Sequence, residues 1–393
     1  MTRRCRLAIS AVGATFVLAA FGTPAAQAQT YTVLHRFTGP DGYFPRAGLI
    51  ADPAGSLFGT TYGGGAAGFG TVFRLDTTGL TVLNSFPGGA DGAILSAGLI
   101  RDSAGNLYGT TWVGGESNRG TVFKLDTTGM ETVLHSFKGG MDGVNPNAAP
   151  IRDSAGNLYG TTWKGGASNH ENGTVFKMEK TGLRNLYLFT GGTDGANPNG
   201  GLIQDSAGNL YGTARHAGAS GFGVVFKLDA AGTQTVLYAF KGGPDGGYPA
   251  AGLARDAAGN FYGTTESGGA GYGVVFKLDT TGTETALYRF TGGADGSNPA
   301  AGLVLDPAGD LYGATVGGGS NTAALGYGVV FKLDATGTET VLHTFSGGAD
   351  GAQPFAGLFR DSAGNLYGTT ANGGGGHNTA CRAGCGVVFK IAP

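Results

Sequence analysis

The chain has 393 residues, and 79 of them are glycine, about a fifth of the chain against a usual share of ~7%. Only 13% of the residues are charged, and 25 Lys and Arg against 27 Asp and Glu give a net charge of −2. This composition excludes the basic surface of nucleic-acid-binding proteins and the three-residue glycine period of collagen, while 41% hydrophobic residues are enough to fill a core.

The N-terminus is typical of a secretory signal peptide. Three arginines within the first six residues precede an apolar stretch over residues 7–21, which is shorter than the ~20 residues of a membrane span. Residues 26–28, Ala-Gln-Ala, supply a cleavage site. We therefore predict that residues 1–28 are removed, that the mature chain has no membrane span, and that the protein is secreted or periplasmic.

Three strings recur seven times each after residue 29. One has the form V-L-x-x-F, a second is typified by AGLIRDSAGNLYGTT at residues 97–111, and a third by GTVFKLDTTG at residues 120–129. The copies are spaced by about 50 residues, a period found in solenoids, propellers and arrays.

Each repeat contains four short runs of β type. In one repeat they span residues 97–101, 107–111, 121–125 and 131–137, and glycine-rich turns separate them. No helical period of 3.6 residues occurs. Four strands in about 50 residues, seven times over, predict an all-β fold: a seven-bladed β-propeller of four-stranded antiparallel blades, with residues 29–393 as one domain.

The two ends of the mature chain are complementary. It begins with a lone fourth-type run at residues 31–37 and finishes with a third-type run at residues 387–391. Pairing these two runs completes the seventh blade, so we predict that the N-terminal strand closes the ring and removes an exposed strand edge.

Two strings, GLIRDSAGNLYGTT at residues 98–111 and GTVFKL at residues 120–125, carry a resemblance to known families. Their order resembles propellers of the NHL and gluconolactonase type, and the unit more closely resembles the choice-of-anchor tandem repeat GloVer-containing proteins of bacteria. The resemblance covers residues 31–391 and implies a surface or extracellular destination. Members often carry a C-terminal anchoring segment. This chain finishes on its last strand, so we expect a freely secreted or periplasmic protein.

Cys381 and Cys385 are the two cysteines of the predicted mature chain. An even pair in an oxidising compartment predicts a disulfide, here within the last long loop.

An aromatic residue follows the paired threonines of the second run in the first three repeats: Tyr62, Trp112 and Trp163. On adjacent blades these rings predict an arc that binds a sugar, with Glu116 and His170 in the neighbouring loops as hydrogen-bonding partners. The alternative is that the rings cap the core between blades, because large aromatic side chains are mostly buried.

The seven loops that read GG-x-DG, or a close variant, each supply one aspartate on the same face. Oxygen ligands suit Ca²⁺, but tight calcium sites gather several acids and Asp-Gly is also a common turn. We expect turns and no resident cofactor, and keep weak Ca²⁺ binding as an alternative. No loop has the ligand spacing of a metal site.

Arg101, Arg152, Arg255 and Arg360 lie at equivalent positions of the innermost run. Pairing with nearby aspartates is the favoured interpretation, since buried arginine is nearly always paired. An anion-binding ring in the channel is the alternative.

No Ser-His-Asp or Cys-His arrangement and no isolated acid pair stands out from the repeats. We therefore predict a secreted binding or scaffold protein, monomeric, with a glycan or cell-surface ligand on the long-loop face and no nucleic-acid partner. The alternative is a lactonase- or glycosidase-like hydrolase with its site at the channel mouth.

Overall fold

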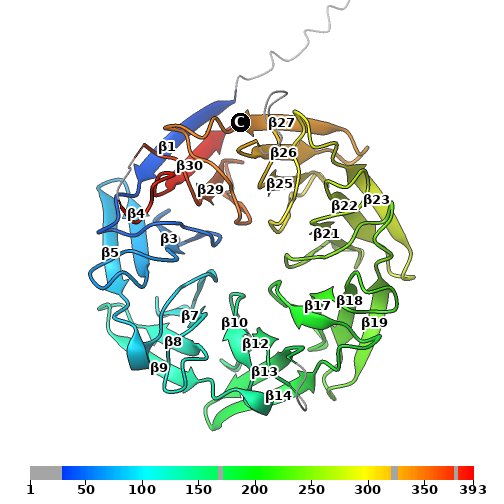
Figure 1. Cartoon of the computed structure of the whole chain (residues 1–393), viewed down its shortest axis with the longest axis horizontal. Helices are drawn as coiled ribbons and strands as arrows, with labels where there is room; N and C mark the ends of the chain where they lie inside the picture. The colour runs from blue at the N-terminus through cyan, green and yellow to red at the C-terminus, as the bar shows by residue number, and fades with distance from the viewer. Residues whose placement is uncertain (1–28, 167–170, 320–325, 376–378) are drawn as a thin grey trace, which may run out of the picture.

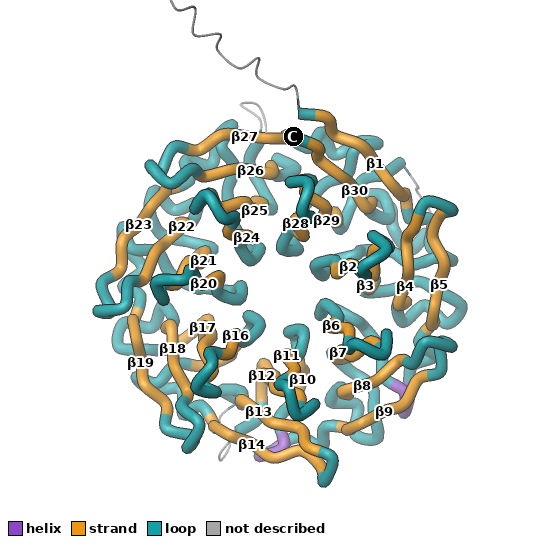
Figure 2. The backbone as a smooth tube through the Cα atoms, turned by 180° about the vertical axis from the view of Figure 1, so that it is seen from behind, coloured by secondary structure: helices purple, strands orange, loops and turns teal. Residues whose placement is uncertain are grey.

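The computed structural model describes residues 29–166, 171–319, 326–375 and 379–393, so the predicted signal peptide lies outside the described residues. Within these described ranges, thirty strands form seven antiparallel sheets that stand as blades around a central channel (Figure 1). This confirms the predicted all-β, seven-bladed propeller. The inner strands surround the channel and the outer strands run along the circumference (Figure 2).

From the channel outward, the first blade consists of β2 (Ile50–Ala51), β3 (Leu57–Thr60), β4 (Thr71–Asp76) and β5 (Gly79–Ser85), and the second of β6 (Ile100–Arg101), β7 (Leu107–Thr111), β8 (Thr121–Leu125) and β9 (Glu131–Ser136). In the same order, the third consists of β11 (Ile151–Arg152), β12 (Leu158–Lys164), β13 (Thr174–Glu179) and β14 (Gly182–Leu188), and the fourth of β16 (Ile203–Gln204), β17 (Leu210–His216), β18 (Val224–Leu228) and β19 (Gln234–Ala239). The fifth blade consists of β20 (Ala254–Arg255), β21 (Phe261–Thr265), β22 (Val274–Leu278) and β23 (Glu284–Arg289). The sixth consists of β24 (Val304–Leu305), β25 (Leu311–Thr315), β26 (Val329–Leu333) and β27 (Glu339–Thr344). The seventh consists of β28 (Phe359–Arg360), β29 (Leu366–Thr370), β30 (Val387–Ala392) and β1 (Thr30–Arg36). Two further strands, β10 (Val144–Pro146) and β15 (Ala196–Pro198), pair with the ends of β12 and β17, and two 3-10 turns are η1 (Gly89–Asp91) and η2 (Gly140–Asp142).

Pairing between β1 and β30 closes the ring. The two strands are antiparallel from Thr30 opposite Ala392 to Arg36 opposite Val387. The Tyr31 hydroxyl also donates to the backbone carbonyl of Asp350 in the loop after β27, which joins the first strand to the sixth blade. The predicted closure by the N-terminal strand is confirmed.

Pairs of phenylalanines seal the blade interfaces. At each interface the Phe that ends an outer strand meets the Phe of the third strand of the next blade, edge to face, with ring centroids 5.0–5.5 Å apart. Both rings of every pair are at most 3% exposed. The repeated phenylalanines are therefore core residues. The contact of Phe37 with Phe73 packs the closing strand against the first blade in the same way.

A disulfide joins Cys381 to Cys385 in the loop between β29 and β30, as predicted, and both cysteines are fully buried. Within the described part of the chain, no helix has the length and apolar character needed to cross a membrane.

Candidate functional site

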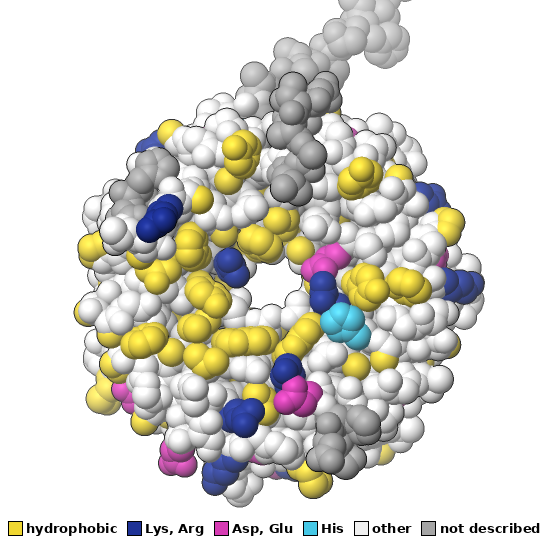
Figure 3. Space-filling model, viewed as in Figure 1, with side chains coloured by type: hydrophobic (Ala, Val, Ile, Leu, Met, Phe, Trp, Pro, Cys, Tyr) yellow, Lys and Arg dark blue, Asp and Glu magenta, His cyan; other side chains and the backbone are white. Residues whose placement is uncertain are grey.

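One residue from each blade surrounds the channel on the face of the long loops, four residues before the inner strand begins. We call these seven residues the mouth ring: Arg46, Ser96, Asn147, Asn199, Ala250, Ala300 and Phe355. The loops before the inner strands pair with the loops after the second strands, for example Tyr43 with Gly63 and Ala93 with Val113, so both loop sets form one face. Figure 3 shows this face, where hydrophobic side chains surround the opening and a few charged groups interrupt them.

Hydrogen bonds between blades hold the mouth ring in place. In five blades, a threonine of the second strand donates its hydroxyl to the backbone carbonyl of the residue that directly follows a mouth-ring residue of the next blade: Thr60 to Ala97, Thr110 to Ala148, Thr213 to Ala251, Thr264 to Ala301 and Thr369 to Ala47. These threonines are buried, so water does not compete for the bonds. The mouth ring is thus fixed by the repeated scaffold although its own side chains vary.

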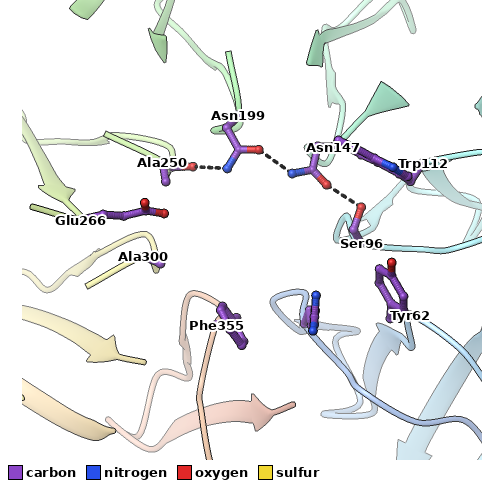
Figure 4. A pocket seen from close by; sticks show the side chains of 10 residues that line it. Tyr62, Ser96, Trp112, Asn147, Asn199, Ala250, Glu266, Ala300 and Phe355 are labelled. Atoms are coloured by element: carbon purple, nitrogen blue, oxygen red, sulfur yellow. Dashed lines mark hydrogen bonds between the residues drawn. The ribbon is translucent and has the colours of Figure 1, made fainter. Parts of the chain in front are cut away.

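Three neighbouring members of the mouth ring form a row of hydrogen bonds. Ser96 Oγ donates to Asn147 Oδ1, Asn147 Nδ2 to Asn199 Oδ1, and Asn199 Nδ2 to the backbone carbonyl of Ala250 (Figure 4). An amide has two N–H donors and two acceptor lone pairs, so each asparagine keeps further hydrogen-bonding capacity. We call Ser96, Asn147 and Asn199 the polar row.

The other side of the mouth is aromatic and cationic. The Arg46 guanidinium lies over the rings of Tyr62 and Phe355, 4.9 and 5.2 Å from their centroids, and 5.9 Å from that of Phe44. Stacking on aromatic faces suits the planar guanidinium and restricts its orientation.

The mouth ring encloses a cavity of about 430 Å³. Tyr62 and Trp112 also line it, and Glu266 lies on the opposite side from Tyr62 (Figure 4). Both aromatic side chains are partly exposed, so they contribute surface to the cavity.

Trp163 lies on the adjacent blade but is not among the described residues that line the cavity. Its ring meets that of His216 at 5.6 Å, and His216 meets Tyr248 at the same distance. Burial lowers the pKa of His216, and the adjacent positive charge of Arg215 lowers it further. Arg215 in turn forms an ion pair with Glu266, so these side chains form a packed cluster across three blades.

Glu116 lies apart from the mouth ring. It lines a separate cavity of about 540 Å³ with Asp91 and His135, next to the outer strand of its own blade, and its backbone N–H donates to Ser136 Oγ at 2.7 Å. The structure therefore places Tyr62 and Trp112 together and Glu116 elsewhere. His170 lies outside the described residues.

The candidate calcium aspartates other than Asp91 accept hydrogen bonds from their own loops and the adjoining outer strands. Asp142 accepts hydrogen bonds from His135 Nε2 at 3.1 Å and from the backbone N–H of Lys138 at 2.7 Å. Burial opposes ionisation of Asp142, but these hydrogen bonds outweigh it and hold its pKa below the ordinary value. Over the ranges that the structure describes, no three His, Cys, Asp or Glu side chains are grouped to hold a metal ion.

The inner-strand arginines reach across blade boundaries. Arg360 pairs with Asp306 of the preceding blade at 3.5 Å and lies over Tyr312. Its three counterparts lie over the aromatic ring of the preceding blade: Arg101 over Phe58, Arg152 over Tyr108 and Arg255 over Tyr211. Pairing is confirmed for Arg360, and the contacts of all four join neighbouring blades.

The polar row was missed by the sequence analysis. Its signal was present: the residue before the A-G-L string, which reads A-A-P in the third repeat and G-G-L in the fourth, is Arg, Ser, Asn, Asn, Ala, Ala and Phe in successive repeats. A position whose chemical type varies this widely between repeats indicates that the scaffold does not determine it.

A ring of seven repeated blades with a lined cavity at one end of its channel defines a β-propeller repeat protein. The Gloeobacter/Verrucomicrobia repeat matches residues 19–171, 75–270 and 241–393, and the chain belongs to this family. A comparison with curated proteins finds no match.

Among solved structures, the fold is similar to virginiamycin B lyase from Staphylococcus aureus, with 13% identity, a TM-score of 0.60, and coverage of 93% of this chain and 99% of that one. It is also similar to the extracellular domain of a candidate hybrid two-component system from B. thetaiotaomicron, with 10% identity, a TM-score of 0.56, and coverage of 93% and 41%. A third is a candidate 6-phosphogluconolactonase from Bacteroides uniformis, with 19% identity, a TM-score of 0.53, and coverage of 81% and 89%. At these identities the likeness shows the fold alone.

Proposed function

We propose that this protein is a secreted or periplasmic binding protein that takes a carbohydrate in the cavity of the mouth ring. The polar row carries the proposal. Sugar hydroxyls both donate and accept hydrogen bonds, and the amides of Asn147 and Asn199 offer both kinds of group side by side. Because the amides also bond to one another, their orientation is fixed before a ligand arrives, which lowers the entropic cost of binding.

The rest of the cavity fits the same ligand class. Its volume of about 430 Å³ lies within the usual range for small-molecule sites. Trp112 supplies an apolar surface for the C–H face of a sugar ring, and Tyr62 lies beside it. Trp163, Glu116 and His170 remain predicted contacts only for a ligand that extends beyond the mouth ring.

Binding is favoured over hydrolysis by the carboxylates present. Among the described residues that line the cavity, Glu266 is the single acid, and it is held by Arg215. Most glycosidases act through a pair of carboxylates about 5–10 Å apart. One carboxylate in an ion pair with an arginine supports a binding role, and turnover of a sugar substrate would contradict it.

Tryptophan fluorescence tests the proposal directly, because Trp112 and Trp163 are the two tryptophans of the chain. In the Trp163→Phe variant, all tryptophan emission comes from Trp112, which lines the mouth cavity. We expect sugars from a panel of mono- and oligosaccharides to change this emission saturably, with no product formed. Trp112→Phe, which keeps Trp163, should respond weakly to the same short ligands.

The polar row provides the matched variants. Asn147→Leu keeps the side-chain shape and removes the amide, so we expect affinity to fall at least tenfold. Ser206 is an exposed residue between β16 and β17 and does not line the mouth cavity, so Ser206→Ala should leave the affinity unchanged. If no sugar changes the emission of Trp163→Phe or releases heat on titration into the native protein, the proposed function is wrong.

A further inference from the structure

Arg46 is the only charged member of the mouth ring and carries the inference. It occupies the same position as Ser96, Asn147 and Asn199 on other blades, so its charge is a departure from the repeat at the rim of the cavity. No acidic side chain in the described part of the chain forms an ion pair with it. The acid that lines the cavity, Glu266, is already paired with Arg215.

The aromatic rings around Arg46 hold its guanidinium without using its donors. The guanidinium carbon of Arg46 lies over the rings of Tyr62 and Phe355, 4.9 and 5.2 Å from their centroids. Because the guanidinium forms no ion pair with a described residue, its five N–H groups are available to a ligand. A planar, oriented set of donors matches the two oxygens of a carboxylate or the oxygens of a sulfate.

We propose that the ligand of the mouth cavity is an acidic sugar whose anionic group binds Arg46 while its hydroxyls bind the polar row; this inference rests on the proposed function. The cavity joins the two sets of groups, with Arg46 and the polar row on its wall. The net positive charge that Arg46 adds at the mouth favours an anion over its neutral counterpart.

Matched pairs of sugars test the inference in the Trp163→Phe protein: glucuronic acid against glucose, and galacturonic acid against galactose, with a sulfated monosaccharide as a third anion. We expect the acid of a pair to bind about tenfold or more tightly than its neutral partner, because the bond to a charged group is stronger. The advantage should decrease as salt is added, since Arg46 is solvent-exposed.

Two variants assign the effect to Arg46. Arg46→Met keeps a stem that packs on Tyr62 and Phe355, so the acid and the neutral sugar of each pair should bind with equal affinity. Arg46→Lys keeps the charge and should retain part of the advantage. Equal affinity for acid and neutral sugars in the parent protein overturns this inference and leaves the proposed function standing, whereas failure of every sugar to bind overturns both.

Discussion

The residue two positions before each mouth-ring residue has a left-handed backbone. The φ angles lie between 54° and 63° at Phe44, Ile94, Asn145, Asn197, Tyr248, Asn298 and Gln353. Asparagine tolerates this region, whereas a β-branched residue is unfavourable there. Backbone hydrogen bonds on both sides impose this conformation. The Ile94 N–H donates to the carbonyl of Phe69 on the preceding blade, and the Ile94 carbonyl accepts from the N–H of Trp112 on its own blade. Each blade therefore accepts local strain to present its mouth-ring residue.

Replacing Ile94 by asparagine should relieve that strain. The left-handed conformation costs roughly 1–2 kcal/mol for an ordinary residue, so we expect Ile94→Asn to raise the free energy of unfolding by about 1 kcal/mol. Chemical denaturation measures the change. Asn298→Ile is the reverse substitution at an exposed equivalent position and should cost a similar amount. A less stable Ile94→Asn protein would show that the packing of Ile94 outweighs backbone strain.

The glycine of the L-Y-G-T string is required by the Phe pairs between blades. A Cβ at Gly160 would lie 2.5 Å from Cζ of Phe176, a ring with no exposed surface. We expect Gly160→Ala to destabilise the protein by about 1–3 kcal/mol, as overpacking does. In Gly243→Ala the nearest atom lies 3.9 Å away, so its melting temperature should stay close to that of the native protein. Equal melting of both variants would contradict the packing argument.

At the scale of the strand, three outer strands begin with a glutamate that faces the preceding blade. Glu131, Glu284 and Glu339 each have one carboxylate oxygen buried without a hydrogen-bond partner among the described residues. Burial, together with the smaller effect of the charges of the neighbouring loop aspartates Asp91, Asp245 and Asp295, raises the pKa of each to about 7. These contacts between outer strands therefore favour protonated carboxyls.

This arrangement predicts that stability decreases between about pH 5 and 8. A pKa near 7 in the folded state exceeds the ordinary 4.5, so the stabilisation is complete below pH 4.5 and is lost as the pH rises through 7. Aspartates with lowered pKa, such as Asp142, act oppositely and reduce stability in stronger acid. The melting temperature of the triple variant Glu131→Gln, Glu284→Gln, Glu339→Gln should vary less with pH over this range. An unchanged slope would exclude these glutamates as its source.

The strands were predictable from the sequence because each repeat states the same pattern again. Strand runs, hairpins and the complementary ends all follow from a period of about 50 residues and from the need to pair every edge. The site was predictable only in part. Glu116 is four residues from Trp112 in the sequence, yet the loop directs it to the outer strand, where its N–H bonds to Ser136. Loop direction depends on tertiary contacts that no period encodes.

At the scale of the whole molecule, the ring depends on one strand that is far from its partner in the sequence. Deleting residues 30–37 exposes the edge of β30 and removes Phe37, which covers Phe73. We expect a lower melting temperature and aggregation, because an unpaired edge recruits other strands. A synthetic peptide of residues 29–38 should restore both properties. Unchanged melting of the truncated protein would contradict closure by this strand.

The same closure has a consequence for the order of assembly. Six blades each form from consecutive residues, but the seventh pairs β1 (Thr30–Arg36) with β30 (Val387–Ala392). The Tyr31 hydroxyl of β1 also reaches the Asp350 carbonyl beside the sixth blade, 319 residues away in the sequence. Long-range pairing is slow, whereas the entropic cost of closing a loop grows only slowly with its length. Refolding should therefore pass through an open horseshoe of six blades, and the final kinetic step should be the docking of β1. Binding of the proposed ligand would then appear last, because the rim of the mouth cavity is complete only when the ring closes.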